Sequence, residues 1–373
     1  MCKINLLLII MSYLKIFFLM LCMILVSCTG QKTGKENDNN DKIAIEVGEI
    51  KFPPQDVLQL KSYYLSSSVH VDSIDYLIGY NYRLHSLDCM NLKSKSVTQI
   101  VLPGDGPDAI VRLSGIYAQS LDSVWISDES ERAFLIDSVG TIKRMIDLKK
   151  YLEDQEQLLI NTNYAMFTSH LFYNASRHSL MFLVKHTPSN TFIVKEAFID
   201  EVGKMATYQL SSSKVVPDMS KGYAYINFPN VNFVGENIVY NYPVESSIYM
   251  LDIRTNERKY ILADSHYTSN IIEKCTTSGD YATLEKHWLE NSHFYDIMYL
   301  PKYKIYACLH ADKVDFDEKK GMEKLINERD LYLMLFDENM EKIGETKLSN
   351  CRYSPFTSWN ATYGGIALFV DNV

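Results

Sequence analysis

The stretch DSVWISDESERAFLIDSVGTIKRMI, residues 122–146, decides the fold. It contains three short runs rich in apolar and β-branched residues, at 122–126, 133–137 and 141–146, and polar or glycine residues separate them. Such runs between turn residues are typical of β-strands. The middle run ends on Asp137, whose side chain can accept hydrogen bonds from the following backbone, as a tight turn requires. The stretch therefore predicts three strands joined by tight turns.

The same pattern returns along the chain at uneven intervals. In five copies the second strand ends on an aspartate, and these residues are Asp88, Asp137, Asp200, Asp252 and Asp337. Their spacing is roughly 50 residues, apart from one longer interval, and this suits the blades of a β-propeller. One blade cannot bury both of its faces, so blades must pack side by side into a closed ring.

These repeats predict an all-β fold, a six-bladed β-propeller over residues 43–373, with seven blades as the alternative. The last strand-like run, at 365–370, would be the second strand of the sixth unit. Because an unpaired edge invites aggregation, the early run KIAIEVGEIK at 42–51 is expected to complete that blade. A further C-terminal piece is the alternative.

The longer interval between aspartates predicts an insertion at about residues 264–330. Its two parts, 264–293 and 312–330, look helical or irregular, and short helices are expected at 270–274 and 318–328. The insertion is expected to project from one face of the ring.

Residues 1–27 have the organisation of a secretion signal: Lys3 and Lys15 are the only charges, and the rest is nearly all apolar. The end, Leu25-Val26-Ser27-Cys28, resembles a bacterial lipobox, in which the cysteine thiol receives diacylglycerol before cleavage. We therefore expect a lipoprotein with a palmitate-type lipid on Cys28. An uncleaved membrane anchor is the alternative, but the unbroken apolar run at 16–26 is shorter than the about 20 residues of a spanning helix.

The segment after the lipidated cysteine predicts a flexible tether over residues 28–42. It contains no large apolar side chain, so it cannot order itself by burial. Thr29, rather than an aspartate, follows the cysteine, and this resembles the sorting signal for the outer membrane. We expect a cell-envelope protein anchored through Cys28, in the outer membrane, facing the periplasm or the surface.

The charge balance argues against one class of partner, and the positions of the cysteines indicate which thiols are buried. Without the two signal lysines, 35 basic residues face 46 acidic ones, a balance unfavourable for binding nucleic acid. Beyond the tether, Cys89 and Cys308 lie in strand-like runs and are expected to be buried. The sequence leaves open whether Cys275 and Cys351 pair.

The lipobox, the tether, the repeated strand units and the turn LPGDGPDAI at 102–110 together resemble the six-bladed β-propeller lipoproteins of unknown function found in Bacteroidetes-type bacteria. Many of these carry a GxGP turn after the first blade, which Gly104-Asp105-Gly106-Pro107 matches. The resemblance implies a propeller from about residue 43 to the end and an envelope location. It implies no catalytic residues.

Two groups of residues are candidates for ligand binding. Gly104, Asp105 and Gly106 could form a backbone nest for an anion or a ligand carbonyl, although a connection between blades that needs glycine is the favoured interpretation. Trp288 and Tyr295, in the insertion, could stack on a sugar ring or a peptide side chain. Packing inside the blades is the alternative for both aromatic residues.

Two clusters contain residue types that bind metals but match no metal motif. The histidines His266, His287, His293 and His310 lie near acidic residues, but their spacing fits no zinc motif, so exposed loop histidines are expected. The triad Asp312, Asp315 and Asp317 fails the EF-hand pattern. We therefore predict neither a metal nor a cofactor.

The chain contains no nucleophile elbow, P-loop or dinucleotide fingerprint, so we predict no catalytic residues. The leading hypothesis is a binding module for a glycan, a peptide or a partner protein. One alternative is a propeller lyase or hydrolase that acts on a polymer, with acidic residues converging on the channel. Another is a structural subunit of an envelope complex. Fold alone cannot choose among them.

Overall fold

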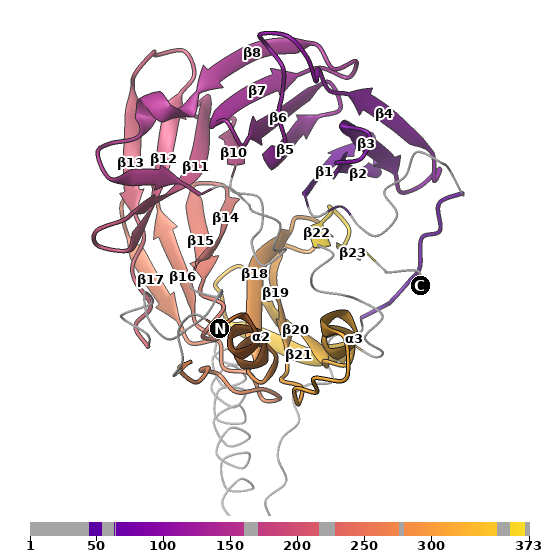
Figure 1. Cartoon of the computed structure of the whole chain (residues 1–373), viewed down its shortest axis with the longest axis vertical. Helices are drawn as coiled ribbons and strands as arrows, with labels where there is room; N and C mark the ends of the chain where they lie inside the picture. Colours follow the sequence, from indigo (N-terminus) through magenta and orange to yellow (C-terminus); the bar gives the residue numbers. More distant parts are fainter. Residues whose placement is uncertain are drawn as a thin grey trace, which may run out of the picture. The chain divides into compact units, whose positions relative to one another are not determined.

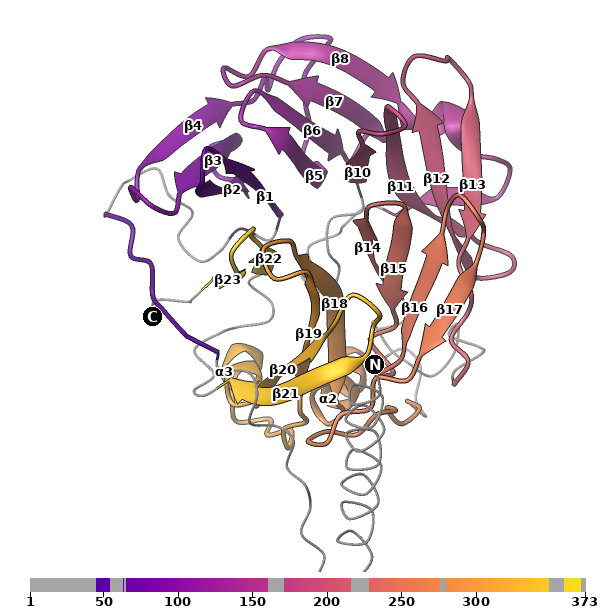
Figure 2. The same cartoon turned by 180° about the vertical axis from the view of Figure 1, so that it is seen from behind.

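The computed structural model describes residues 45–53, 63, 65–159, 171–215, 228–275, 280–348 and 359–369. The signal, Cys28 and the tether lie outside these residues. Within the unit that spans Lys42–Val373, antiparallel sheets follow one another around a common centre (Figures 1 and 2). This arrangement confirms the prediction of an all-β propeller.

Five sheets form full blades, each with strands paired in chain order. Blade 1 consists of β1 (Ser66–Val71), β2 (Ile74–Asn81), β3 (Ser86–Asn91) and β4 (Val97–Val101). Blade 2 consists of β5 (Leu113–Ser120), β6 (Ser123–Asp128), β7 (Arg132–Ile136) and β8 (Ile142–Asp147), followed by the short 3-10 helix η2 (Leu148–Tyr151).

Blade 3 consists of β10 (Leu171–Asn174), β11 (Ser179–His186), β12 (Thr191–Phe198) and β13 (Met205–Gln209), and β9 (Glu156–Leu158) also pairs with β11. Blade 4 consists of β14 (Asn230–Val234), β15 (Asn237–Asn241), β16 (Ile248–Asp252) and β17 (Arg258–Ile261). Blade 5 consists of β18 (His293–Leu300), β19 (Ile305–Ala311), β20 (Leu331–Phe336) and β21 (Lys342–Leu348).

The sixth position holds a two-stranded sheet, β22 (Trp359–Ala361) and β23 (Ile366–Leu368). The described part of the chain therefore has five full blades and this smaller sheet, where six full blades were predicted. The segment 45–53 contains no strand, so the predicted strand at 42–51 is wrong for its described residues. Ile45 and Phe52 instead place their side chains against the cores of blades 5 and 1.

Apolar side chains from neighbouring blades pack together and close the ring. The cluster that contains Leu87 and Phe134 joins blades 1 and 2, and the one around Trp125 joins blades 2 and 3. Further clusters join blades 3 and 4, blades 4 and 5, and blade 5 with β22 and β23. Ala367 and Phe369 then pack against the core of blade 1. Burial between blades, rather than within one sheet, therefore holds the fold together.

Three of the five predicted turn aspartates do what the sequence indicates. The Oδ1 atom of Asp137 accepts hydrogen bonds from the backbone N–H groups of Val139 and Thr141, at 3.1 and 2.8 Å. Asp252 and Asp337 hold their turns in the same way. The prediction is wrong for Asp88, which lies inside β3 and is fully buried.

The predicted insertion consists of two separate segments, because β18 and β19 lie between them. The first carries helix α2 (Tyr281–Leu289) and the second carries helix α3 (Met322–Asn327). The helix expected at 318–328 is thus present in shorter form. The helix expected at 270–274 is absent, since Ile271 forms an isolated bridge with Glu245. Neither of the two described helices has the length and apolarity that a membrane span requires.

Candidate functional site

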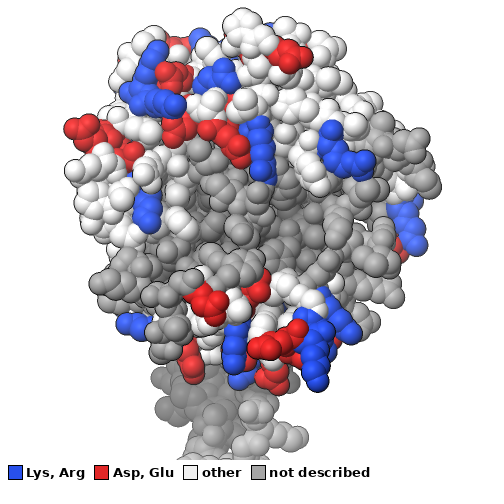
Figure 3. Space-filling model, in the orientation of Figure 1, with Lys and Arg blue, Asp and Glu red and all other residues white. Residues whose placement is uncertain are grey.

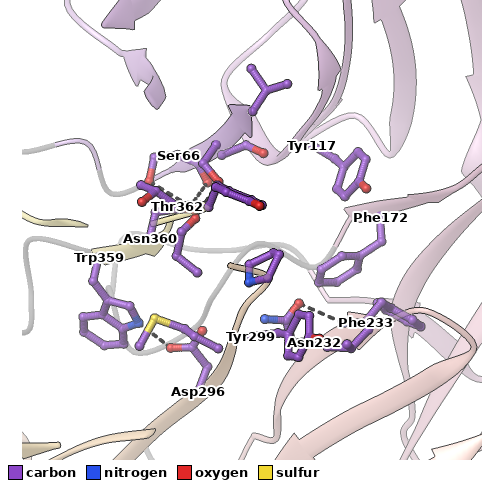
Figure 4. Close-up of a pocket in the computed structure, with 18 of the residues that line it drawn as sticks. Ser66, Tyr117, Phe172, Asn232, Phe233, Asp296, Tyr299, Trp359, Asn360 and Thr362 are labelled. Carbon is purple, nitrogen blue, oxygen red and sulfur yellow. Dashed lines mark hydrogen bonds between the residues drawn. The ribbon is translucent and has the colours of Figure 1, made fainter. Parts of the chain in front are cut away.

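A cavity of about 440 Å³ lies at the centre of the ring. Its lining comes from the first strand of each blade, namely β1, β5, β10, β14 and β18, together with β22 and the turn after it. Figure 4 shows these side chains around the cavity. A volume of this size can enclose a small ligand or part of a larger one.

Side-chain hydrogen bonds join the inner strands, which form no continuous sheet with one another. The Ser67 hydroxyl on β1 accepts from the Ala118 N–H on β5, at 2.9 Å. Asn232 on β14 donates to the Ile297 carbonyl on β18, at 3.0 Å, and Asn360 on β22 donates to the Ser66 carbonyl on β1, at 2.9 Å. These polar side chains fix the wall of the cavity from blade to blade.

Aromatic rings dominate the half of the cavity built by β5, β10 and β14. Tyr117, Phe172 and Phe233 lie there together (Figure 4). The ring centroids of Phe172 and Phe233 are 4.4 Å apart, and those of Tyr117 and Phe172 are 6.2 Å apart. All three side chains are partly exposed, so their rings offer an apolar wall that a ligand can contact.

The half built by β18, β22 and β1 carries polar side chains beside apolar ones such as Met298. Asp296, Asn360, Thr362 and Ser66 lie there (Figure 4). The Trp359 indole N–H donates a hydrogen bond to Oδ1 of Asp296 at 2.5 Å. Ligand hydroxyl or amine groups would find their partners on this side.

A β-bulge places Asp296 in this wall. The register between β18 and β19 shifts between Phe294 and Ile297, so Asp296 stands outside the regular pairing. Bulges commonly redirect a side chain in this way. The side chain is buried, with 4% of the residue exposed, and this burial raises the pKa of the carboxyl to about 7, against a smaller opposing effect of the Trp359 hydrogen bond. None of the described lining residues is Lys or Arg.

A histidine and an aspartate meet at the edge of the cavity. Nδ1 of His70, at the end of β1, lies 2.6 Å from Oδ1 of Asp75. The His70 ring stacks on Tyr363, with centroids 4.1 Å apart, and Oδ2 of Asp75 accepts from the Gly364 N–H at 3.3 Å. His70 and Tyr363 both belong to the lining. The group formed by His70, Asp75 and Tyr363 therefore lies at the border between the polar half of the cavity and the exterior.

A family model described as Domain of unknown function (DUF4221) matches residues 36–347. The chain belongs to this family. Comparison with curated proteins gives no match. The match to this DUF4221 protein spans blades 1 to 5 and ends within β21, before β22 and β23.

Two solved structures from Bacteroides resemble this DUF4221 protein. A member of the DUF4221 family from Bacteroides vulgatus ATCC 8482 has a TM-score of 0.68 at 14% identity, covering 85% of this chain and 89% of that one. A protein from Bacteroides fragilis NCTC 9343 that is described as exported has a TM-score of 0.50 at 14% identity, covering 81% and 75%. At these identities the likeness concerns the fold alone.

The predicted turn at Gly104, Asp105 and Gly106 lies away from the cavity of this DUF4221 protein. The three residues are exposed and connect β4 of blade 1 to β5 of blade 2. Gly106 has a φ of 91°, which favours glycine. The Pro103 carbonyl accepts from the Ile110 N–H at 2.8 Å and closes the loop. The geometry is that of the inter-blade connection, the interpretation favoured from the sequence.

The predicted aromatic pair does not face solvent. Trp288 on α2 and Tyr295 on β18 are 3% and 1% exposed. The Arg329 guanidinium lies 4.9 Å from the Trp288 ring centroid, and Tyr295 packs on Trp359 with centroids 4.7 Å apart. Stacking of a ligand on either residue therefore does not fit their burial, because other side chains already cover both rings.

The prediction of exposed loop histidines is wrong for three of the four. His293 and His310 are fully buried, and His287 is 9% exposed. Burial lowers the pKa of His293 well below its ordinary value, and its Nδ1 accepts from the Trp288 indole N–H at 3.1 Å. Among the described residues no group of three or more His, Cys, Asp or Glu side chains could hold a metal ion.

The buried cysteines agree with the sequence. Cys89 and Cys308 are buried free thiols, and burial raises the pKa of Cys89 to about 12. Cys275 is a partly buried free thiol, and Cys351 lies outside the described residues.

The sequence patterns assigned neither Asp296 nor Phe172 to a ligand site. Asp296 stands in an apolar strand, and an acid inside a strand was the available signal. On the described part of the face in Figure 3, acidic and basic side chains are intermixed.

Proposed function

We propose that this DUF4221 protein is an envelope-anchored binding module whose ligand, a glycan or a peptide segment, occupies the central cavity. The observation that carries the proposal is the two-sided lining of that cavity. Tyr117, Phe172 and Phe233 form an apolar wall, and Asp296, Asn360 and Thr362 form a polar wall opposite. Sugars and many peptide side chains combine an apolar face with hydrogen-bonding groups, and such ligands suit a wall of each kind.

The test compares the cavity with the insertion. Full-length protein is screened against glycan and peptide libraries, and hits are measured by calorimetry for Phe172→Ala and for the control Phe316→Ala. Both phenylalanines are partly buried, but Phe316 lies in the second insertion segment and packs against the hydrophobic cluster that joins blades 3 and 4. We expect the cavity variant to weaken binding by about tenfold or more, or about 1.4 kcal/mol. Loss of binding in Phe316→Ala with Phe172→Ala unaffected would move the site to the insertion.

Anchoring through Cys28 is a separate part of the proposal. The lipobox at 25–28 supports it, as does the description of the Bacteroides fragilis structure as an exported protein. Cells grown with an alkyne analogue of palmitate should label the wild-type chain, and Cys28→Ala should abolish the label and release the protein from membranes. Equal labelling of Cys28→Ala and of Cys22→Ala would contradict lipidation at Cys28.

A catalytic role is the second candidate, and two features favour it. Asp75 orients the His70 imidazole through Nδ1, as carboxylates orient catalytic histidines, and Asp296 lies in the same cavity lining with a pKa near 7. An enzyme of this kind would be a lyase or hydrolase acting on a polymer. His70→Gln should then abolish turnover of a bound polymer while leaving its affinity within about twofold. Turnover that survives in both His70→Gln and Asp296→Asn would exclude this candidate.

A further inference from the structure

Asp296 lacks the cationic partner that several other buried acids have among the described residues. Asp88 and Glu245 are buried without such a partner too, but of these three acids Asp296 is the one that lines the cavity. Asp128 pairs with Arg132, Glu196 with Arg177 and Glu345 with Lys342. For Asp296, the described residues provide no ion pair, and Trp359 is the side chain that donates to it. A buried carboxylate without a counter-charge is unfavourable in its ionised form.

Because Asp296 lies in a cavity wall, a ligand can supply the positive charge that the protein does not. The residue belongs to the wall of an existing cavity, whose described lining contains neither Lys nor Arg. Trp359 donates to Oδ1 and fixes the carboxyl group. A cation that entered the cavity would supply the missing charge without displacing any ion pair.

The remaining lining suits the rest of such a ligand. Phe172 and Phe233 lie with ring centroids 4.4 Å apart on the half opposite Asp296 (Figure 4). The aromatic half accepts an apolar or ring-shaped body, and aromatic faces also attract cations. Anionic ligands, by contrast, would meet the Asp296 carboxylate with no Lys or Arg in the described lining, and His70 at the cavity edge already pairs with Asp75.

We propose that the ligand carries a primary ammonium group that pairs with Asp296, attached to a ring or aliphatic body that lies against the aromatic half. The inference rests on the proposed binding role of the cavity and names the ligand class. An amino sugar and a basic amino-acid-like amine share this chemistry, and the test separates them.

The experiment uses two matched pairs of probes on the full-length protein, with affinity measured by calorimetry and ligand-observed NMR. Glucosamine is compared with glucose, and phenethylamine with 2-phenylethanol. We expect the amine of at least one pair to bind about tenfold more tightly than its neutral partner, or about 1.4 kcal/mol. Preference within the first pair assigns an amino sugar, and preference within the second assigns an arylalkyl amine.

Asp296→Asn should abolish the preference while retaining weak binding of the neutral probe. Asp200→Asn is the matched control, because it removes the same charge from a side chain that is 62% exposed on the outer part of blade 3. The preference should survive in this control. Equal affinity for amine and neutral probes in the wild type, which needs no variant, would overturn the inference.

Failure of this inference is distinguishable from failure of the proposed function. Neutral probes that bind as well as amines, and that lose affinity in Phe172→Ala, would leave the cavity as the binding site and reject the ammonium group. Amines that keep their preference in Asp296→Asn would also reject it.

Discussion

Blades 2 and 5 each bury an aspartate, and the two residues lie in opposite surroundings. In blade 2, both Asp128 oxygens are occupied: they accept from the N–H groups of Val111, Ser130 and Arg132, from the Ser130 hydroxyl and from the Arg132 guanidinium. In blade 5, Asp296 has Trp359 as its side-chain donor and faces the cavity. A satisfied acid stabilises the scaffold, and an under-satisfied one at a cavity is available for a ligand.

The surroundings of Asp128 also explain how blades 1 and 2 connect. Arg132 donates to the Ala109 carbonyl at 2.7 Å, and Val111 donates to Asp128. One ion pair thus holds the end of the 102–110 loop against the turn between β6 and β7. Substitutions at and around Asp128 and Asp296 test whether the first has a structural role and the second a role in ligand binding.

The largest effect is expected at Asp128. Replacement by Ala removes the acceptor of several buried donors and leaves Arg132 without its partner, so the free energy of unfolding should fall by about 3–5 kcal/mol. Urea unfolding followed by circular dichroism measures this, with exposed Asp105→Ala as the control. A loss below about 1 kcal/mol would mean that the network adds little to the scaffold.

The next largest effect is expected in the pH dependence of the free energy of unfolding, through the ionisation of Asp296. Its folded pKa of about 7 lies above the ordinary value of 3.8, so the fold favours the protonated acid. The stabilisation is fully present below about pH 4 and is lost as pH rises through 7, a change of at most about 4 kcal/mol.

Asp296→Asn cannot ionise, so it should match the wild type in stability near pH 4 and exceed it near pH 8. Urea unfolding across this range measures the difference. Cys308, a neighbouring group on β19, does not confuse the result, because burial holds its pKa well above the ordinary value. Parallel pH profiles for the two proteins would show that Asp296 ionises freely in the fold.

A smaller effect is expected from Trp359→Phe, which keeps a ring but removes the N–H donor. The pKa of Asp296 should rise, since that hydrogen bond lowers it, and about 2 kcal/mol of stability should be lost where the acid is charged. Carbon-13 NMR titration of the carboxyl follows the pKa. Trp125→Phe in blade 2 is the matched control: Trp125 is also buried, but its Nε1 has no hydrogen-bond partner among the described residues. Similar losses in both variants would assign the effect to ring size.

The smallest effect is expected in the loop between blades 1 and 2. Gly106→Ala forces a side chain into a φ of 91°, at a cost of about 1 kcal/mol, although the space around it is open. Gly104→Ala should cost less, because a Cβ there meets His85 Cδ2 at an ordinary 3.7 Å. Thermal denaturation separates the two, and neither should alter binding in the cavity. Reduced affinity in Gly106→Ala would favour a role for the turn in ligand binding.

The sequence predicted the blades better than their closure. Asp137, Asp252 and Asp337 mark real turns, because a carboxylate that accepts from the next residues acts over a few positions only. Asp88 follows the same local pattern, yet Tyr63, Asn81 and Gln99 donate to it inside blade 1. Those partners lie 7 to 25 residues away in sequence, outside the strand that carries Asp88, and no local rule locates them.

The candidate site was the less predictable part. Trp288 and Tyr295 are aromatic residues near an insertion, as a surface site would require, but Arg329, just after α3, and Trp359, on β22, pack against them. Their burial follows from contacts between elements far apart in the chain. Both Phe172 and Asp296 line the cavity, but Phe172 has no distinctive sequence neighbours, and the acid inside an apolar strand marks Asp296 as unusual without locating the cavity.

Strands, tight turns and the need for blades to pack into a ring follow from the sequence, because alternating apolar residues and turn-forming side chains act at short range. The packed ring, by contrast, is what places β1, β5, β10, β14, β18 and β22 around one cavity, with a bulge that turns Asp296 into its wall. The pKa of that acid depends on desolvation by strands that are distant in the chain, so only the closed ring creates it.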